Sequence, residues 1–334
     1  MKHANISIFI PHLGCPFACS FCAQNTISGA GRAPTPEEVE ATIAEAFGRI
    51  TDKSERAKTE IAFFGGSFTA IPRDYMTSVL TAARGYLGEG GFKGIRVSTR
   101  PDCIDDEVLT LLKGYGVTAI ELGAQSMDDD VLSANKRGHT AEDVERSSAL
   151  IRSYGFELGL QMMTGLYKSS PEGDLETGRK IAALSPDTVR IYPTVIIRHT
   201  LLGRLYEQRE YVPYSFDECI NVCARLLGMF GEKNIRVIRL GLHAERSLEK
   251  DMIGGFYPPA LGELVRSELV RQLIDKALEE GHADAEAPKR MMSILYGHKH
   301  SNRVYFSDMD VSFSINDGIP DGCISVNGNI HEIM

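Results

Sequence analysis

Three cysteines stand close together near the start of the chain, in the stretch LGCPFACSFCAQN. Cys15, Cys19 and Cys22 are spaced C-x3-C-x2-C, so one loop carries three thiols. The thiolate form of cysteine is the form that binds metals and that reacts. The spacing therefore predicts a metal or redox site in this loop, and several uses of cysteine compete for it.

Two common uses of cysteine fit this spacing badly. A structural zinc site takes four ligands, usually as separated pairs, but no fourth ligand stands out, and the spacing of His12 is not that of a zinc ribbon. A thioredoxin-like site needs only Cys-x-x-Cys beside its own helix. Three thiolates can instead hold three irons of a [4Fe–4S] cluster, whose irons normally take four thiolates. One iron then stays open to an exogenous ligand. Chance clustering of structural thiols is the remaining alternative.

The segments around this loop alternate between short β-rich runs and longer helical patterns. We expect strands over 6–10, 59–65, 94–100, 117–126, 157–166 and 188–197, each followed by a helix. Strands separated by helices imply right-handed crossovers and a parallel sheet. Six such units give a doubly wound sheet or an incomplete barrel, and both place the active site at the carboxyl ends of the strands. We expect a partial (βα)6 barrel of parallel strands, with the cysteine loop at that end.

The pattern changes after about residue 240. Residues 259–280 form an amphipathic helical pattern, and four short antiparallel strands are expected at RVYFS (303–307), DVSFSI (310–315), CISV (323–326) and NIHEI (329–333). Asn327-Gly328 is a typical hairpin turn. We therefore expect a barrel over residues 1–240 and a small C-terminal α+β cap over residues 241–334.

Composition narrows the class of protein. The chain has 334 residues, and its apolar runs are shorter than the roughly 20 residues needed to span a membrane. We expect a cytoplasmic protein with no membrane segment, in which the seven cysteines stay reduced. The net charge of −9 disfavours a broad nucleic-acid footprint and leaves room for a local basic patch.

The cysteine motif resembles that of the radical S-adenosylmethionine superfamily, with the aromatic Phe21 directly before the third cysteine, in the loop after the first strand. The resemblance implies that Cys15, Cys19 and Cys22 hold a [4Fe–4S] cluster whose open iron chelates S-adenosylmethionine. The reduced cluster cleaves that cofactor, and the 5′-deoxyadenosyl radical abstracts a hydrogen atom from a substrate. It also implies a reductant protein such as flavodoxin or ferredoxin.

Further motifs resemble a narrower group, the radical domain of the Elongator catalytic subunit and its prokaryotic relatives. They run in order from about residue 5 to 240: STRPD (98–102), ELGAQS (121–126), NKRGHT (135–140), VRIYPTVIIRHT (189–200) and YVPYS (211–215). This resemblance implies a tRNA nucleoside as substrate. We expect no counterpart of that subunit's acetyltransferase domain or of its long basic N-terminal extension, and therefore not its carboxymethyl-uridine reaction.

The resemblance also predicts which side chains contact the cofactor. Gly65, Gly66 and Ser67 follow the second strand, where the superfamily uses Gly-Gly-acid to hold the amino group of the cofactor; a tight turn is the alternative. Arg137 resembles the arginine that pairs with the cofactor's carboxylate, which suits a guanidinium fork; a solvated helix end is the alternative. The predicted cofactor-binding residues are Phe21, Gly65, Gly66, Ser67, Ser98, Gln125 with its neighbour Ser126, and Arg137.

Several residues stay open at this stage. Ser98 could reach the ribose, and Tyr192 could face the substrate. Glu121 is either a polar group inside the barrel or a hydrogen-bond partner of the adenosine. Cys219 and Cys223 lie at i and i+4 on one helix, but a second cluster would need more ligands, and buried thiols are common. The basic stretch 289–303 could contact phosphates, with an aromatic stacking on a base, or could be a solvated loop.

Three functions compete. The first is a radical enzyme that modifies RNA, most simply tRNA, which would bind RNA in a salt-sensitive way. The second is a radical enzyme acting on a small metabolite, lipid or peptide, which would have a closed apolar pocket. The third is a non-catalytic iron–sulfur or zinc module that does not bind S-adenosylmethionine. No catalytic side chain is predicted, because the cofactor carries the hard chemistry.

Overall fold

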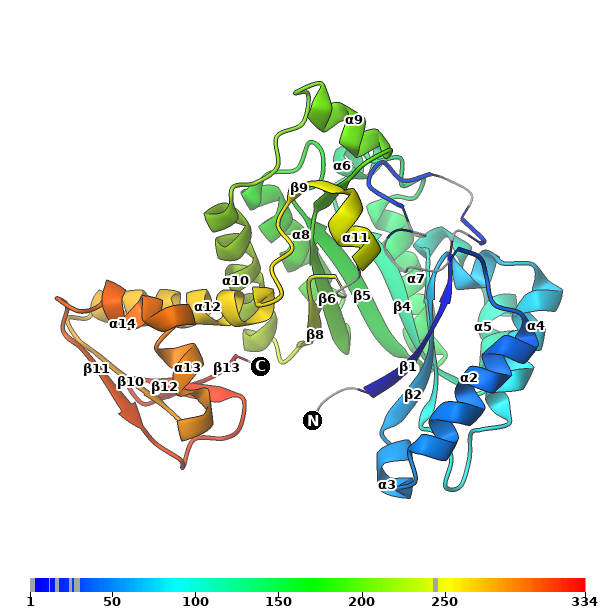
Figure 1. Ribbon diagram of the computed structural model, residues 1–334, viewed down its shortest axis with the longest axis horizontal. Coiled ribbons are helices and arrows are strands. Elements are labelled where there is room, and N and C mark those ends of the chain that lie inside the picture. Colours follow the sequence, from blue (N-terminus) through cyan, green and yellow to red (C-terminus); the bar gives the residue numbers. More distant parts are fainter. Residues whose placement is uncertain are drawn as a thin grey trace.

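The main body of the protein is a curled sheet of seven parallel strands (Figure 1). The structure is a computed structural model and describes residues 4–11, 13–15, 18–23, 26, 31–242 and 246–333. His12 lies outside the described residues. In spatial order the strands are β1 (Ala4–Ile10), β2 (Thr59–Gly65), β3 (Gly94–Thr99), β4 (Val117–Gln125), β5 (Glu157–Thr164), β6 (Thr188–Pro193) and β8 (Arg236–Leu240).

Helices cover the outer face of this sheet (Figure 1). Those of the barrel are α2 (Pro36–Arg49), α3 (Lys53–Arg56), α4 (Arg73–Arg84), α5 (Asp106–Gly114), α6 (Asp129–Ala134), α7 (Ala141–Ser153), α8 (Pro171–Ala183) and α10 (Phe216–Glu232), with short 3-10 turns η1 (Phe68–Ala70) and η2 (Pro101–Cys103). Helix α9 (Leu201–Glu207) lies beyond the carboxyl ends of the strands (Figure 1). The start of α2 follows from its sequence, because Thr35 and Glu38 form a capping box around Pro36. The fold is the predicted partial barrel.

The strands separate apolar from charged side chains. Successive residues of a strand point to opposite faces of the sheet. On β3, Ile95 and Val97 join the hydrophobic core, while the alternate residue Arg96 is buried among the carboxylates Glu60 and Glu121 of neighbouring strands. The sheet therefore has an apolar outer face under the helices and a charged interior.

Two features of the barrel differ from the sequence prediction. The barrel has a seventh strand, β8, which the alternation of basic and apolar residues in RVIRL concealed. The predicted strand 188–197 is two strands, since the chain leaves the barrel after β6 and β7 (Val195–Ile197) pairs antiparallel with β9 (Met252–Gly255). Together with α11 (Arg246–Asp251), this ribbon lies beyond the carboxyl ends of the barrel strands (Figure 1).

The C-terminal residues form a small four-stranded sheet with helices beside α10 (Figure 1). Its elements are α12 (Leu261–Leu278), β10 (Ala283–Ala287), η3 (Lys289–Met291), α13 (Met292–Leu295), η4 (His298–His300), α14 (Ser301–Tyr305), β11 (Val311–Ile315), β12 (Cys323–Val326) and β13 (Asn329–Glu332). The apolar face of α12 packs on α10 and shares one core with the barrel.

Three predictions for this region were wrong in detail. RVYFS is not a strand, because α14 takes up most of it; the buried Asn302 donates to the carbonyls of Ser267 and Leu295 and fixes the helix there. Strand β10 was missed, since its alanines are weak β-formers. It runs parallel to β11, so the sheet is not wholly antiparallel. The hairpin turn at Asn327-Gly328 is confirmed, with φ of 49° and 80°.

In the part of the chain that the structure describes, no helix is long and apolar enough to cross a membrane. The structure describes all seven cysteines, and no disulfide joins any of them.

Candidate functional site

A cavity lies at the carboxyl ends of the first five barrel strands. All the predicted ligand residues except Ser126 are among its lining. The lining residues are Cys15, Ala18, Cys19, Phe21, Cys22, Gly65, Gly66, Ser67, Ser98, Thr99, Arg100, Gly123, Gln125, Arg137 and Gln161. The fold therefore brings together residues that are far apart in the sequence, while the role of each in binding stays a prediction.

The cysteine loop is anchored through Ser20, which lies between the second and third cysteines and is fully buried. Its amide donates to the Asn135 carbonyl at 3.0 Å, and its hydroxyl donates to Asn135 Oδ1 at 2.6 Å. Its carbonyl accepts from the amide of Leu202, on α9, at 2.7 Å. All the polar groups of Ser20 are thus used to fix the loop against two other segments.

The Asn135 side chain is also fully buried and holds a third segment. Its Nδ2 donates to the carbonyl of Val131 at 2.8 Å and to that of Tyr167 at 2.9 Å. One amide thus joins the cysteine loop, the end of α6 and the loop after β5. Ser20 and Asn135 were not predicted as site residues, although Asn135 opens the NKRGHT motif.

Arg137 reaches the cysteine loop itself. Its Nη1 donates to Cys19 Sγ at 3.1 Å, and its Nη2 donates to the Gly123 carbonyl at 2.6 Å. Its Nε is buried without a hydrogen-bond partner. The residue is 6% exposed, so the alternative of a solvated helix end is wrong. A buried cation with an unused donor suits an anionic ligand group in the cavity.

The glycines at the end of β2 are needed for a close approach of two backbones. The Gly66 amide donates to the Ile10 carbonyl at 2.7 Å, and a Cβ at Gly66 would lie 2.0 Å from the Leu13 carbonyl oxygen. Gly65 has a φ of 113°, which side chains disfavour. The Ser67 hydroxyl lies 2.8 Å from Thr99 Oγ1. Gly65, Gly66 and Ser67 therefore form the tight turn that was the alternative interpretation, and the same three residues also line the cavity.

The environment of Cys15 pulls its pKa in two directions. Burial and the neighbouring Cys19 raise the pKa of the Cys15 thiol, while the Ser67 amide and the guanidinium groups of Arg100 and Arg137 oppose this effect. The net result is a pKa above the usual value. Metal binding requires the thiolate form of cysteine, and the positive charges of two nearby guanidinium groups favour that ionised form.

Gln125 and Ser126 take different roles. β4 bulges between Gly123 and Gln125, and Gln125 has a φ of 66°. The bulge turns Gln125 toward the cavity, where its Oε1 is buried without a partner. Ser126 does not line the described cavity; its hydroxyl lies 3.3 Å from Thr177 Oγ1 on α8. The prediction that Ser126 lines the site was wrong, because the bulge shifts by one residue which side chains point to each face of the sheet.

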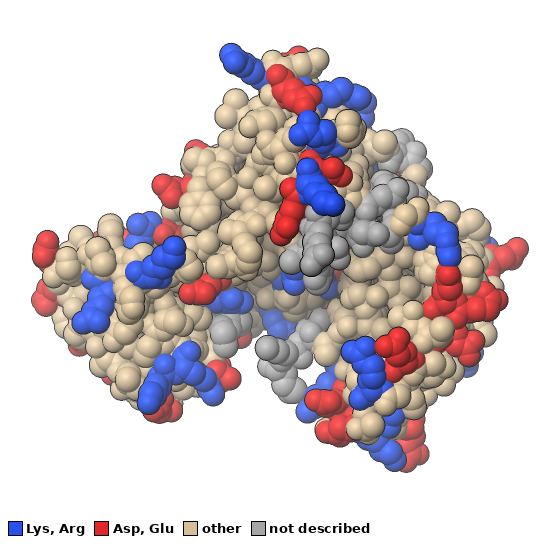
Figure 2. Space-filling model, in the orientation of Figure 1, with Lys and Arg blue, Asp and Glu red and all other residues tan. Residues whose placement is uncertain are grey.

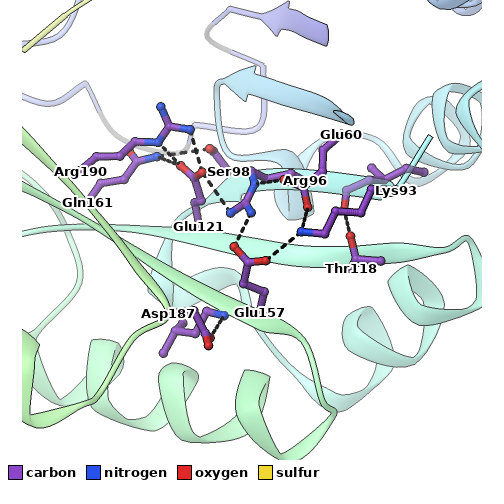
Figure 3. A network of polar contacts seen from close by, with 12 residues as sticks. Glu60, Lys93, Arg96, Ser98, Thr118, Glu121, Glu157, Gln161, Asp187 and Arg190 are labelled. Carbon is purple, nitrogen blue, oxygen red and sulfur yellow. Dashed lines mark hydrogen bonds and ion pairs between the residues drawn. The ribbon is translucent and has the colours of Figure 1, made fainter. Parts of the chain in front are cut away.

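The floor of the cavity rests on charged side chains inside the barrel (Figure 3). Glu121 is fully buried and forms ion pairs with Arg96 and Arg190. It is therefore a polar group inside the barrel, which decides between the two alternatives for this residue. Gln161, which sequence analysis missed, bridges Glu121 and Ser98.

Other candidates lie apart from the cavity. Tyr192 lies outside its described lining, and burial raises the pKa of that phenol. Cys219 and Cys223 are buried on α10, with Cys223 Sγ 4.0 Å from Thr164 Oγ1. Among the described residues, no group of three His, Cys, Asp or Glu side chains could hold one metal ion. A second metal site on α10 therefore gains no support.

The donors and acceptors of the cavity fit the cofactors predicted for it. A zinc ion needs ligands that converge on one point, which the described residues do not offer. In a [4Fe–4S] cluster each iron takes its own thiolate, so three thiols around one cavity suffice. The unused Arg137 Nε suits a carboxylate, and the unused Gln125 Oε1 suits an ammonium group. Both groups occur in S-adenosylmethionine.

A partial parallel barrel with three clustered cysteines after its first strand defines a class of metal-dependent enzymes. The chain matches the Radical SAM superfamily over residues 9–178 and the Radical_SAM C-terminal domain over residues 186–271. Since the first match covers half of the chain, the protein belongs to the radical SAM superfamily, where SAM stands for S-adenosylmethionine. The cofactors of that superfamily are a [4Fe–4S] cluster and S-adenosylmethionine, and its members need a source of electrons.

Curated relatives support the narrower resemblance. The chain is 26% identical over 247 residues to a tRNA uridine(34) acetyltransferase of Dehalococcoides mccartyi, covering 63% of this chain and 52% of that protein. It is 32% identical over 192 residues to Elongator complex protein 3 of Danio rerio, covering 52% of this chain and 35% of that protein. The chain thus spans about half, or less, of the length of these relatives.

Solved structures confirm the fold. The archaeal Methanocaldococcus infernus Elp3 with an N-terminal deletion superposes with a TM-score of 0.62 at 22% identity, covering 84% of this chain and 63% of that one. Streptococcus suis SuiB gives a TM-score of 0.52 at 11% identity, covering 74% of this chain and 51% of that one.

Proposed function

We propose that this radical SAM enzyme modifies a nucleoside of tRNA. The observation that carries the proposal is the convergence of Cys15, Cys19, Cys22 and Arg137 on one cavity at the strand ends. The substrate class rests on the relatives, which are named for uridine-34 of tRNA and for Elongator. The acetyl transfer in the first name is not part of the proposal.

In this proposal the side chains of the cavity bind and orient the cofactors. The thiolates of the three cysteines hold three irons, and Ser20 with Asn135 keeps their loop in place. Arg137 holds the cofactor's carboxylate through Nε, and Gln125 Oε1 accepts from its ammonium group. When bound, the two cofactors would supply a 5′-deoxyadenosyl radical that abstracts a hydrogen atom from the substrate.

The remaining predicted contacts concern the walls of the cavity. We propose that Phe21 shields the cluster from water, since it packs against Ile196, Leu202 and Tyr211 at the rim. The Gly65-Gly66-Ser67 turn presents backbone groups to the cofactor's amino end, and Ser98 presents a hydroxyl from the floor. Water exclusion matters because a reactive intermediate must meet the substrate first.

The basic stretch 289–303 supports RNA binding only in part. Lys299 and His300 are exposed and have φ of 54° and 65°, and Arg303 lies over the Tyr296 ring at 5.4 Å. Two other basic groups of the stretch already have acidic partners, in the pairs Arg290–Asp321 and His298–Glu263. Figure 2 shows basic side chains scattered over the C-terminal unit, at the left of the view, with no single patch.

A small metabolite, lipid or peptide is the second candidate substrate. The net charge of −9 and the acidic side chains that gather over α2, α3 and α4, at the right of Figure 2, favour it. The reductant in either case is a small electron-transfer protein such as flavodoxin or ferredoxin. The cytoplasmic location stays a prediction from the use of cysteine.

The test compares turnover with and without RNA. The anaerobically reconstituted enzyme is incubated with S-adenosylmethionine, dithionite and either total tRNA, the same tRNA digested to nucleosides, or buffer, and 5′-deoxyadenosine is measured. The proposal predicts stimulation by intact tRNA that declines as salt rises, with a new nucleoside mass in the digested product. Equal turnover in all three arms would reject tRNA and favour the second candidate.

A further inference from the structure

A network of charged side chains, most of them buried but with Lys93 41% exposed, runs through the barrel interior (Figure 3). Three carboxylates and three cations take part, and the ion pairs among them link strands β2 to β6. The carboxylates are Glu60, Glu121 and Glu157, and the cations are Lys93, Arg96 and Arg190. Burying ion pairs is costly, because each charge loses its water. A network of this size beside a ligand cavity therefore calls for a role besides packing.

Glu121 contacts a residue that lines the cavity, and each of its oxygens accepts two hydrogen bonds. Its Oε1 accepts from Arg190 Nη2 at 2.9 Å and from Arg96 Nη1 at 3.3 Å. Its Oε2 accepts from Arg190 Nε at 2.7 Å and from an amide N–H at 2.8 Å. Burial raises the pKa of Glu121, but the two guanidinium groups outweigh it and hold the pKa below its usual value. Glu121 is thus an ionised group that only accepts hydrogen bonds.

A glycine lets Glu121 reach its partner two strands away. Glu121 is on β4 and Arg190 is on β6, so the carboxylate must cross β5. At the crossing, Gly159 is opposite Glu121, and a Cβ there would lie 2.7 Å from Glu121 Cγ. The sequence ELGLQ therefore leaves the space that the contact needs.

The charge of Glu121 decides how Gln161 is turned. The amide that Glu121 accepts is Gln161 Nε2, so the NH2 group of Gln161 faces the carboxylate. Its second N–H donates to Ser98 Oγ at 3.3 Å. Gln161 Oε1 is left without a partner among the described residues, and the Ser98 proton is not needed by Gln161. Both residues line the cavity.

We propose that Glu121 is a positioning residue that acts on the ligand through Gln161 and Ser98. It fixes the polarity of the cavity floor, so that a bound ligand meets a carbonyl acceptor and a hydroxyl donor side by side. This pair is complementary to a ligand hydroxyl, which donates one hydrogen bond and accepts another. The inference rests on the proposed function, because S-adenosylmethionine is the ligand that tests it.

The test measures the dissociation constant of S-adenosylmethionine by calorimetry on the anaerobically reconstituted protein. Glu121→Gln removes the charge that orients Gln161, and we expect about tenfold weaker binding, the effect of one misdirected hydrogen bond. Glu60→Gln is the matched control, because Glu60 is an equally buried partner of Arg96 with no bond to Gln161. The control should change the constant less than twofold.

A double-mutant cycle separates positioning from general loosening of the fold. If Glu121 acts through Gln161, Glu121→Gln has no further effect on the dissociation constant once Gln161→Met is present. A purely structural role would weaken binding equally in both backgrounds, and this outcome would overturn the inference. Glu121→Asp replaces Glu121→Gln if the latter does not fold, since it keeps the charge but is too short for Gln161.

Binding of S-adenosylmethionine by the wild type and by the variants distinguishes failure of the proposed function from failure of the positioning role. Wild-type protein that carries the cluster but does not bind S-adenosylmethionine would overturn the proposed function. Wild-type protein that binds it, with Glu121→Gln no weaker than Glu60→Gln, would leave the function intact and overturn the positioning role of Glu121.

Discussion

Asn135→Ala should destabilise the protein before any iron is bound. The side chain is fully buried and makes three hydrogen bonds, with Ser20 Oγ, the Val131 carbonyl and the Tyr167 carbonyl. Each such bond contributes about 1 kcal/mol net, and a partner left unsatisfied in a buried site costs more. We therefore expect the free energy of unfolding to fall by about 3 kcal/mol.

Urea unfolding of the iron-free protein, followed by circular dichroism, measures this change. Asn329→Ala is a suitable control, since Asn329 is exposed on β13 and its substitution should change stability by less than about 0.5 kcal/mol. The reconstituted Asn135→Ala variant should also hold less iron, because the cysteine loop loses its anchor. A loss of stability below about 1 kcal/mol, with full iron content, would refute the view that Asn135 holds the loop.

Two other predictions concern Gly66, which lines the cavity, and the buried His139. Gly66→Ala places a Cβ 2.0 Å from the Leu13 carbonyl oxygen and should lower the free energy of unfolding by about 3 kcal/mol or more. Gly48→Ala, with open space around its Cβ, should not destabilise the protein. The midpoints of urea unfolding compare the two variants. Burial, helped by the nearby Arg137, lowers the pKa of His139 to about 4. The unfolded chain then binds the proton more readily, so about 2 kcal/mol of stability is lost between pH 7.5 and pH 5. His139→Phe should remove that loss of stability. If the variant keeps the pH dependence of the wild type, His139 is not its source.

The sequence was sufficient for the elements with strong patterns. Buried apolar runs and capped helices identified six strands and their helices, and the cysteine spacing predicted a metal site in the loop after the first strand. Charged and alanine-rich strands were harder: β8 carries arginines and β10 alternates alanine with acids. Their strand form depends on neighbours that the local sequence does not contain.

The site was predictable where the side chain itself suggests chemistry. Arg137 and the cysteines have such side chains, and all of them line the cavity. Ser20, Asn135 and Gln161 act through hydrogen bonds to segments distant in sequence, and nothing in their spacing signals this. Ser126 was misplaced because a β-bulge at Gln125 shifts the alternation of faces.

The most direct test of the account is cofactor cleavage by the reconstituted protein. Wild type and a variant with Cys15, Cys19 and Cys22 all changed to Ala are treated with iron and sulfide under anaerobic conditions. Each is then given dithionite and S-adenosylmethionine, and 5′-deoxyadenosine is measured by chromatography. We expect a four-iron cluster and 5′-deoxyadenosine in the wild type and neither in the variant. Zinc in place of iron in the wild type, or equal amounts of 5′-deoxyadenosine from both proteins, would contradict it.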